Sequence, residues 1–377
     1  MREYIKLCDV CDFQGGSQPP KDEWSFDFKA GYIRMLQIRD FTQSERVAPE
    51  YIKITKTTGT CEADDILIAR YGASLGKILT GLSGAYNVAI MRTIPDTNIL
   101  EKKYLYYYLK SPVFQGFLLN VGSRAAQAGF NKNDLQDLFI PNITRNEQVE
   151  IVGILERVET VIESRQKELQ KLDDLIKARF IEMFGRPFIN NLNWESKQIK
   201  NVVNEVKYGT SKPSVENGEY KYLRMNNLTY DGRFDLTDLK FISLNNDELE
   251  KCVVRKGDVL FNRTNSLDLI GKTAEFDFNE DMVIAGYIIR IRLKETIVPK
   301  FFSMYMNTDE MKLHLRTIAK GAVNQANINA QELQEIPIYL PPIELQNQFA
   351  DFVRQVDKSR FDIKKSIIEL EREVVYD

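Results

Sequence analysis

The sequence contains two copies of one pattern. GGSQP at Gly15–Pro19 returns as GTSKP at Gly209–Pro213, and DDILIAR at Asp64–Arg70 returns as GDVLFNR at Gly257–Arg263. In the same order, YIRMLQI is matched by YLRMNNL and LQDLFI by LQEIPI. The offset between the copies drifts from 190 to 198 residues, as small loop insertions would cause. We therefore predict that this chain of 377 residues folds as two copies of one domain.

Each copy ends in a segment that predicts a long helix. Residues 146–184 contain no proline, and apolar residues recur in them at alternating steps of four and three, which is typical of a coiled-coil seam. The predicted seam residues are Ile151, Leu155, Val158, Ile162, Leu169, Leu172 and Ile176 in the first copy, and Phe349, Val353, Val356, Ile363, Ile367, Leu370 and Val374 in the second. Arg165 and Arg360 interrupt the seams. Each either pairs with an acid across the seam or extends its charge past the seam's edge.

The predicted fold class is α+β. Short strand-like runs such as VAIMRTI and YIIRIRL alternate with turn residues and precede helical stretches. Because neither long helix can bury its seam alone, we expect the two to pair antiparallel as a coiled coil, with pseudo-twofold symmetry. At 1.5 Å per residue they would be about 58 Å and about 50 Å long. The predicted boundaries are 1–142 and 186–342 for the globular domains, and 143–185 and 343–377 for the helices.

The sequence argues against several classes of protein. The N-terminus lacks the apolar core of a signal peptide, and no run approaches about 18 apolar residues, so we expect a cytoplasmic protein without a membrane segment. Cys8 and Cys11 form one CxxC, but the other two cysteines have no Cys or His nearby, and we expect no metal site. No nucleophile motif accompanies His314, so we expect no catalytic role for it.

The stretch ARYGASLGK at Ala69–Lys77 looks like a phosphate-binding loop but departs from one. A P-loop has four residues between its first glycine and its Gly-Lys step, followed by Ser or Thr. GASLGKI has one residue too few, and Ile78 stands where the hydroxyl should be. The second copy has Thr273 at the hydroxyl position but Ser266 in place of the glycine. We therefore expect no catalytic residue and no cofactor in this chain.

Both copies carry polar and basic residues in predicted loops. Asn and Gln can read adenine, Arg can read guanine, and Lys and Ser can hold phosphates, whereas the alternative is that these side chains cap turns and hydrate loops. The net charge of −3 excludes a uniformly basic surface, so contact with DNA would be local. The candidate DNA-binding residues of the first copy are Ser17, Gln18, Arg34, Gln37, Arg70, Ser74, Lys77, Arg124, Gln127 and Asn131. Those of the second copy are Ser211, Lys212, Arg224, Asn226, Asn227, Arg263, Asn265, Lys272, Asn324, Gln325, Asn327 and Asn329.

With these motifs in order, the chain resembles the specificity subunit of type I restriction-modification enzymes. The resemblance rests on the duplicated openings, on DDILIARYGASLGK and GDVLFNRTNSLDLIGK, on IPNITRNEQ and LPPIELQNQ before the helices, and on ARFIEMFG at Ala178–Gly185. It implies two target-recognition domains that each read one half of a bipartite site in double-stranded DNA. The antiparallel helices would set the spacer between the halves, and the subunit itself would be non-catalytic.

The resemblance also implies partners and their cofactors. Two modification subunits, adenine-N6 methyltransferases that use S-adenosylmethionine, would pack against the helices. Two restriction subunits, which are translocases and nucleases that use ATP and magnesium, would join them. Two other hypotheses stay open from the residues alone: a coiled-coil scaffold that joins two protein-binding domains, and a nucleotide-binding enzyme that uses Lys77 and Lys272.

Overall fold

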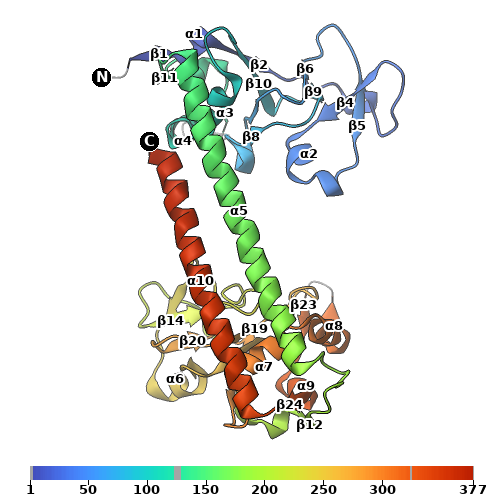
Figure 1. Ribbon diagram of the computed structural model, residues 1–377. Helices are drawn as coiled ribbons and strands as arrows, with labels where there is room; N and C mark the ends of the chain where they lie inside the picture. The colour runs from blue at the N-terminus through green and yellow to red at the C-terminus, as the bar shows by residue number, and fades with distance from the viewer. Residues whose placement is uncertain (1–2, 123–128, 323–324, 377) are drawn as a thin grey trace. The chain divides into compact units, whose positions relative to one another are not determined.

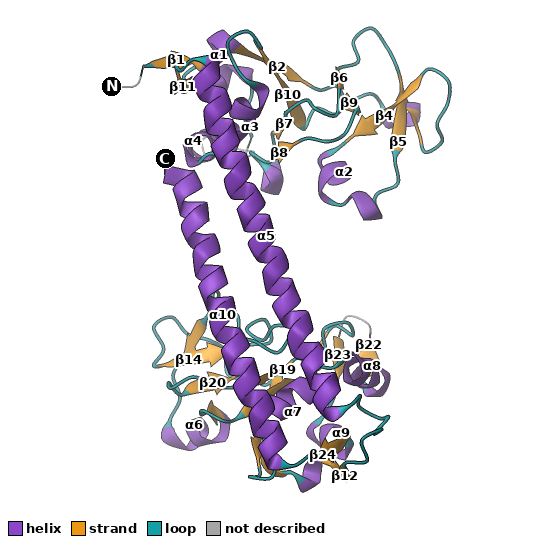
Figure 2. Cartoon of the chain, viewed as in Figure 1, coloured by secondary structure: helices purple, strands orange, loops and turns teal. Residues whose placement is uncertain are grey.

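The computed structural model describes residues 3–122, 129–322 and 325–376. The chain divides into two compact units: unit 1 comprises residues 1–164 and 366–377, and unit 2 comprises residues 165–365. Each unit has its own sheets and its own hydrophobic core (Figures 1 and 2). Within these described ranges, none of the helices combines the length and the apolar character that crossing a bilayer requires.

Unit 1 is built from short strands and helices. Its sheets have the orders β1-β11, β2-β10-β7-β8 and β3-β5-β4-β9-β6. The strands are β1 (Tyr4–Lys6), β2 (Cys11–Gly15), β3 (Trp24–Ser25), β4 (Tyr32–Leu36), β5 (Glu50–Lys53), β6 (Thr60–Cys61), β7 (Leu67–Ala69), β8 (Ile78–Leu79), β9 (Gly84–Tyr86), β10 (Ile90–Pro95) and β11 (Phe139–Pro141). The helices are α1 (Leu7–Val10), α2 (Ile38–Thr42), α3 (Lys102–Lys110), α4 (Pro112–Gly122) and the start of α5 (Arg145–Phe184), with 3-10 turns η1 (Lys21–Glu23), η2 (Ser44–Arg46), η3 (Gly72–Ser74) and η4 (Lys132–Leu135).

Unit 2 follows the same plan. Its sheets have the orders β12-β24, β13-β21-β17-β19, β15-β14-β20-β16 and β18-β23-β22. The strands are β12 (Glu195–Gln198), β13 (Val203–Tyr208), β14 (Tyr220–Leu223), β15 (Lys240–Ile242), β16 (Val253–Val254), β17 (Val259–Asn262), β18 (Thr264–Asn265), β19 (Thr273–Glu275), β20 (Met282–Ile284), β21 (Ile288–Leu293), β22 (Lys320–Ala322), β23 (Gln325–Asn327) and β24 (Pro337–Leu340). The helices are α6 (Asn246–Cys252), α7 (Pro299–Met306), α8 (Asp309–Ile318), α9 (Ala330–Glu335) and most of α10 (Ile343–Tyr376), with the 3-10 turn η5 (Ile199–Asn201).

Most described strands of the two units correspond, and the exceptions are β3 and the sheet β18-β23-β22. β2-β10-β7-β8 corresponds to β13-β21-β17-β19, and β5-β4-β9-β6 corresponds to β15-β14-β20-β16. In the latter two sheets the central pair, β4 with β9 or β14 with β20, is parallel, while its outer neighbours are antiparallel. The predicted duplication and the α+β fold class are therefore confirmed.

One glycine makes the same close approach in each copy. The N–H groups of Gly16 and Gly209 donate to the first carbonyl of β10 and of β21, respectively. A Cβ on either glycine would lie 2.2 Å from a backbone carbonyl oxygen. Only a residue without a side chain fits such a gap. The sequence match paired Gly15 with Gly209, but the backbone bonds pair Gly16 with Gly209, so the alignment of the two openings shifts by one residue.

Gly209→Ala is expected to destabilise unit 2 by about 3 kcal/mol, because a backbone carbonyl cannot move aside as the end of a side chain can. Gly286→Ala is the matched control, since the nearest atom to its Cβ would be 3.5 Å away. Thermal unfolding of the two variants measures the difference. Equal melting temperatures for both variants and the parent chain would contradict the expectation.

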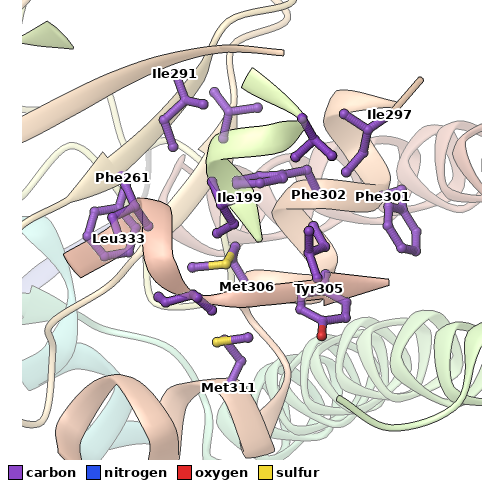
Figure 3. Close-up of a cluster of buried hydrophobic side chains, with 14 of the residues drawn as sticks. Ile199, Phe261, Ile291, Ile297, Phe301, Phe302, Tyr305, Met306, Met311 and Leu333 are labelled. Carbon is purple, nitrogen blue, oxygen red and sulfur yellow. The ribbon is translucent and has the colours of Figure 1, made fainter. Parts of the chain in front are cut away.

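The core of unit 2 joins the sheet β13-β21-β17-β19 to α7. Figure 3 shows Phe301 and Phe302 of α7 in the same buried cluster as Phe261 of β17 and Ile291 of β21, and all four are fully buried. Burying a side chain of this size stabilises the fold by about 2–3 kcal/mol. This cluster therefore fixes the position of the strands whose ends carry the polar loops.

The two long helices begin and end within two residues of their predicted bounds. In unit 2 they run antiparallel, since Phe180 of α5 contacts Phe349 of α10 while Asp173, two turns earlier in α5, pairs with Arg360, three turns later in α10. All predicted seam residues with a described side chain are buried or half-buried. The side chain of Val374 lies outside the described part of the chain.

Of the two predicted roles for a seam arginine, Arg360 has one and Arg165 has the other. Arg360 is 7% exposed, pairs with Asp173 across the seam, and donates to the carbonyl of Leu169 at 3.3 Å. Arg165 pairs instead with Glu168 on its own helix at 2.8 Å and keeps 43% of its side chain exposed. Arg360 therefore fixes the register of the helices in unit 2, and Arg165 extends along the surface.

Candidate nucleic-acid interface

A cleft of about 920 Å³ opens on unit 2 at the ends of several strands. Its walls are the loop that follows β13, the end of β14, the start of β18, the turn between β20 and β21, and the hairpin of β22 and β23. The residues that line it are Thr210, Ser211, Lys212, Pro213, Ser214, Tyr222, Arg224, Met225, Asn226, Arg263, Thr264, Ala285, Gly286, Tyr287, Lys320, Gly321, Gln325 and Asn327. The lining is mainly polar loop residues supported by rigid strands.

The charge of the cleft is of one sign. Among the described residues that line it, Lys212, Arg224, Arg263 and Lys320 are cationic, and none is acidic. The acids that pair with three of these cations lie outside the lining: Glu248 pairs with Lys212, Asp238 with Arg224, and Glu332 with Lys320. Exposed pairs of this kind contribute little to stability, about 0–1 kcal/mol each. They hold the three cations along the walls of the cleft and offset part of their positive charge.

Arg263 and its counterpart Arg70 each lie over a tyrosine ring, although Tyr208 comes from β13 and Tyr71 is the residue after Arg70. The Arg263 guanidinium lies 4.8 Å from the centre of the Tyr208 ring, and that of Arg70 lies 5.0 Å from the Tyr71 ring. Both also donate from Nη1 to a carbonyl of the turn before β21 or β10, at 3.3 and 3.1 Å. Stacking and hydrogen bonds hold each guanidinium in place, and the Nε of Arg70 adds a second bond, to the Phe130 carbonyl at 3.1 Å. The Nε of Arg263 is buried, so in each arginine the remaining Nη N–H groups are the ones left for a ligand.

The structure brings seven of the predicted residues of the second copy into the cleft: Ser211, Lys212, Arg224, Asn226, Arg263, Gln325 and Asn327. Sequence reasoning missed Thr210, Tyr287 and Lys320, which also line it. The sequence did hold a signal for Lys320: it is a basic residue next to Gly321, in the same hairpin as Gln325. Asn324 lies outside the described residues.

Four other predicted residues of the second copy have structural bonds instead. Asn227 is 1% exposed and donates to the carbonyls of Asp235 and Asp238. Asn329 caps the N-terminus of α9 by accepting from two backbone N–H groups at 2.9 Å. Asn265 donates to the side chain of Asn262 at 2.8 Å. These three residues therefore follow the alternative to DNA contact, in which polar side chains cap turns and bond within loops. The fourth residue, Lys272, is buried.

Lys272 supports the cleft from beneath. Its side chain is 8% exposed, and its ammonium donates to the carbonyl of Met225, which lines the cleft, at 3.3 Å. Burial lowers the pKa of Lys272. The neighbouring Thr273 donates its hydroxyl to the Gly271 carbonyl at 3.0 Å. Neither side chain is free to hold a phosphate or a magnesium ion, which removes the support for a nucleotide site in this loop.

Lys312 of α8 is a second buried lysine near this loop. It is 3% exposed, donates to the Gly271 carbonyl at 2.8 Å, and lies 4.7 Å from the centre of the Tyr230 ring. Burial, and then the charges of Lys272 and Arg316, lower its pKa to about 7, although Asp231 opposes the shift. A buried ammonium without a carboxylate partner destabilises the folded state.

Lys312→Met is therefore expected to stabilise unit 2 at pH 7 by about 3 kcal/mol. In this variant the carbonyl of Gly271 loses the bond from Lys312 but still accepts one from the Thr273 hydroxyl, so it is not left without a donor. Because the folded pKa is lowered from 10.5 to about 7, the unfolded chain binds more protons between these pH values. Stability of the parent chain should rise across that range, and the advantage of the variant should shrink. Thermal unfolding at several pH values measures this, and a difference that is constant or grows with pH would contradict it.

Several of the predicted residues of the first copy are also bonded within their own unit. Arg34 pairs with Asp40 at 2.8 Å, and Gln37 donates to Glu50 at 2.6 Å. Asn131 caps the turn η4, as Asn329 caps α9. Gln18 and Lys77 are exposed, and Ser17 and Ser74 are half-buried in loops. Arg124 and Gln127 lie outside the described residues.

The comparisons with known proteins agree with this geometry. The family model for the type I restriction modification DNA specificity domain matches residues 2–174 and again residues 191–372. The MjaVIII specificity subunit of a type I restriction enzyme of Methanocaldococcus jannaschii is 24% identical over 379 residues, which cover 94% of this chain and 86% of that protein. The MjaX protein of the same organism, named for the same kind of subunit, is 27% identical over 179 residues, which cover 46% of this chain and 42% of that protein.

One solved structure extends the likeness to the fold of the whole chain. A chain from a structure of a type I restriction-modification system matches 99% of this chain and 95% of its own length, with a TM-score of 0.63 and 17% identity. The two proteins thus share a fold.

Proposed function

The chain belongs to the type I restriction modification DNA specificity family, and from this premise we propose that it is the non-catalytic subunit that gives a type I restriction-modification complex its DNA sequence specificity. Each of its two copies of the domain would read one half of a bipartite site in double-stranded DNA. The predicted domain boundaries, 1–142 and 186–342, remain part of this proposal.

The cleft of unit 2 is the observation that carries the proposal. Its described lining is cationic without an acid, and it offers Asn, Gln and Arg side chains that can read base edges. The similar tyrosine and carbonyl contacts of Arg70 and Arg263 support a second reading surface in unit 1. The exact contacts with bases and phosphates are proposed from these residue types and positions.

We also propose that α5 and α10 form an antiparallel coiled coil that sets the spacer and docks the modification subunits. The outer face of α5 exposes Ile154, Val161 and Leu175, which recur at multiples of seven residues, and α10 exposes Phe361 and Ile368 at the same interval. Exposed apolar residues in such a stripe favour a protein partner. S-adenosylmethionine, ATP and magnesium would be bound by the modification and restriction subunits, in the cytoplasm.

A methylation map tests the proposal. The chain is expressed with its modification subunits in a host that lacks other adenine methylation, and the genomic DNA is sequenced by a method that detects N6-methyladenine. One discontinuous sequence with two fixed halves and an unread spacer is expected. Stable assembly with no methylated sequence, and DNA binding that does not change with salt, would favour the scaffold hypothesis instead, because phosphate contacts weaken as salt rises.

A further inference from the structure

The loop between β14 and β15 connects the cleft of unit 2 to the long helices. This segment, residues 224–239, is here named the β14–β15 connector. Its first residues, Arg224 and Asn226, line the cleft. Further along the connector, Arg233 lies outside the cleft lining and contacts α5 and α10. One short segment therefore touches both the candidate reading surface and the candidate spacer helices.

Arg233 forms ion pairs with both helices of unit 2. Its Nη2 lies 2.9 Å from a carboxylate oxygen of Asp173 in α5 and 3.4 Å from one of Asp357 in α10. Its Nη1 pairs with Asp231 inside the connector. Burial opposes the charge of Arg233, but these three carboxylates outweigh it and raise the pKa of the guanidinium. Asp173 also accepts from Arg360 of α10, so two arginines share one carboxylate where the helices meet.

The connector is stiff between Arg233 and the cleft. The N–H of Thr229 donates to the carbonyl of Arg233, and the N–H of Asp235 donates to the carbonyl of Asn227, each at 2.9 Å. The buried side chain of Asn227 adds a third bond, to the Asp235 carbonyl at 2.9 Å. These bonds close a small hairpin. A rotation of Arg233 would therefore be carried to Arg224 and Asn226, which precede the hairpin directly.

Two further contacts hold the tip of the hairpin. The Tyr230 hydroxyl accepts from Arg316 of α8 at 2.9 Å, and the Tyr230 ring lies over the ammonium of Lys312. Gly232 has a φ of +79°, and a Cβ there would lie 2.6 Å from the Thr273 carbonyl oxygen. The hairpin is thus pressed against the body of unit 2 at its tip and against both helices at Arg233.

We propose that Arg233 is a positioning residue that fixes the reading cleft of unit 2 to the α5–α10 pair. This inference rests on the proposed function, because it assigns Arg233 the task of transmitting the geometry of the spacer helices to Arg224 and Asn226. In the first copy, Arg34 of β4 is the counterpart of Arg224 and pairs with Asp40, and Arg39 of α2 pairs with Glu50, both within unit 1. The effect of Arg233 is therefore expected at the half-site that unit 2 reads.

The test uses Arg233→Met, which keeps the length of the side chain but removes its charge, in the complete complex with the modification subunits. Methylation rates are measured on duplexes that keep both half-sites and have the cognate spacer or one base pair more or less. The variant is expected to methylate the cognate duplex about 10- to 100-fold more slowly and to lose most of its preference for the cognate spacer. Arg233→Lys keeps the charge but has one nitrogen in place of the two that pair with the helices and with Asp231, and it should be intermediate. Arg255→Met removes another paired arginine of unit 2 and should leave both quantities unchanged.

A second variant guards against a general loss of folding. Asp357→Asn weakens the contact of Arg233 with α10 at 3.4 Å, and with it the longer 3.7 Å pair of Asp357 with Arg360, but leaves the shared Asp173 in place. It should weaken the preference for the cognate spacer in the same direction, by a smaller factor. Full spacer preference in a folded Arg233→Met complex, or in Asp357→Asn, would overturn the proposal. If the parent complex methylated no bipartite sequence, the proposed function itself would fail, which is a different result.

Discussion

The double substitution Arg224→Gln with Arg263→Gln is expected to weaken binding of the cognate duplex by about 30- to 1,000-fold without unfolding unit 2. Both guanidiniums line the cleft: Arg224 follows the end of β14, and Arg263 lies between β17 and β18. A bidentate contact between an arginine and a base, or a contact with a phosphate, contributes about 1–3 kcal/mol. The contributions of two neighbouring contacts do not add fully, so we expect an effect in the lower part of this range.

The dependence on salt separates the two kinds of contact. If both arginines bind phosphates, the slope of log affinity against log salt should fall by about 2, and binding should weaken equally on all sequences. If they read bases, the slope should change little, and discrimination at one half-site should relax. Measuring affinity for cognate and noncognate duplexes at several salt concentrations distinguishes these results.

The control removes the same charge from the same unit. Arg255→Gln with Lys256→Gln takes away two exposed cations that pair with acids outside the cleft lining. It should leave cognate binding within about twofold. Equal losses in both double variants would mean that net charge, rather than the cleft, governs binding, and would contradict the assignment of the interface.

The fold could be predicted largely from the sequence because its strongest signals are local. A repeated motif and a heptad spacing are visible without knowing what packs on them, and they placed the ends of α5 and α10 within two residues. The one-residue shift at Gly16 was not visible. The pair GGS offers two glycines, and only the carbonyl against which Gly16 packs decides which of them is required.

The site was predicted less completely, for a chemical reason. An asparagine that caps a helix and one that reads adenine use the same amide groups, so the sequence near Asn226 and near Asn329 is equally polar. The fold separates them: Asn226 lines the cleft, and Asn329 caps α9. Lys272 is similar, because a lysine in a loop is usually exposed, and only the chain that lies over it makes this one buried.

Exchanging one half of the molecule for that of a relative is expected to change one half-site of the methylated sequence and leave the other intact. The predicted boundaries, residues 186–342, would cut through a packed cluster. Phe301 inside that segment packs on Phe184 of α5 at 4.8 Å between ring centroids, and Phe184 packs on Phe349 of α10 at 5.5 Å. Exchanging residues 165–365, the whole of unit 2, keeps these contacts and the Arg233 ion pairs together.

The exchange is measured by the methylation map of the hybrid complex. A new sequence in one half, with the other half and the spacer length unchanged, is the expected result. A hybrid that alters both halves would contradict independent reading by the two units. The 186–342 exchange serves as the comparison, and it should give a lower melting temperature than the 165–365 exchange because the phenylalanine cluster then combines side chains from two proteins.

Lengthening both helices by one heptad is expected to lengthen the spacer by about three base pairs. Seven residues add about 10.5 Å of helix, and base pairs are stacked about 3.4 Å apart. An insertion near Leu169 of α5 would displace the carbonyl that accepts from Arg360. Insertions after Ser164 and after Lys365 avoid this, because they fall where the chain passes from one unit to the other. The same heptad inserted in α5 alone shifts the register of one helix against the other, so it should lose cognate methylation without gaining a longer site. A spacer that stayed the same in the doubly lengthened chain would show that the helices do not set it.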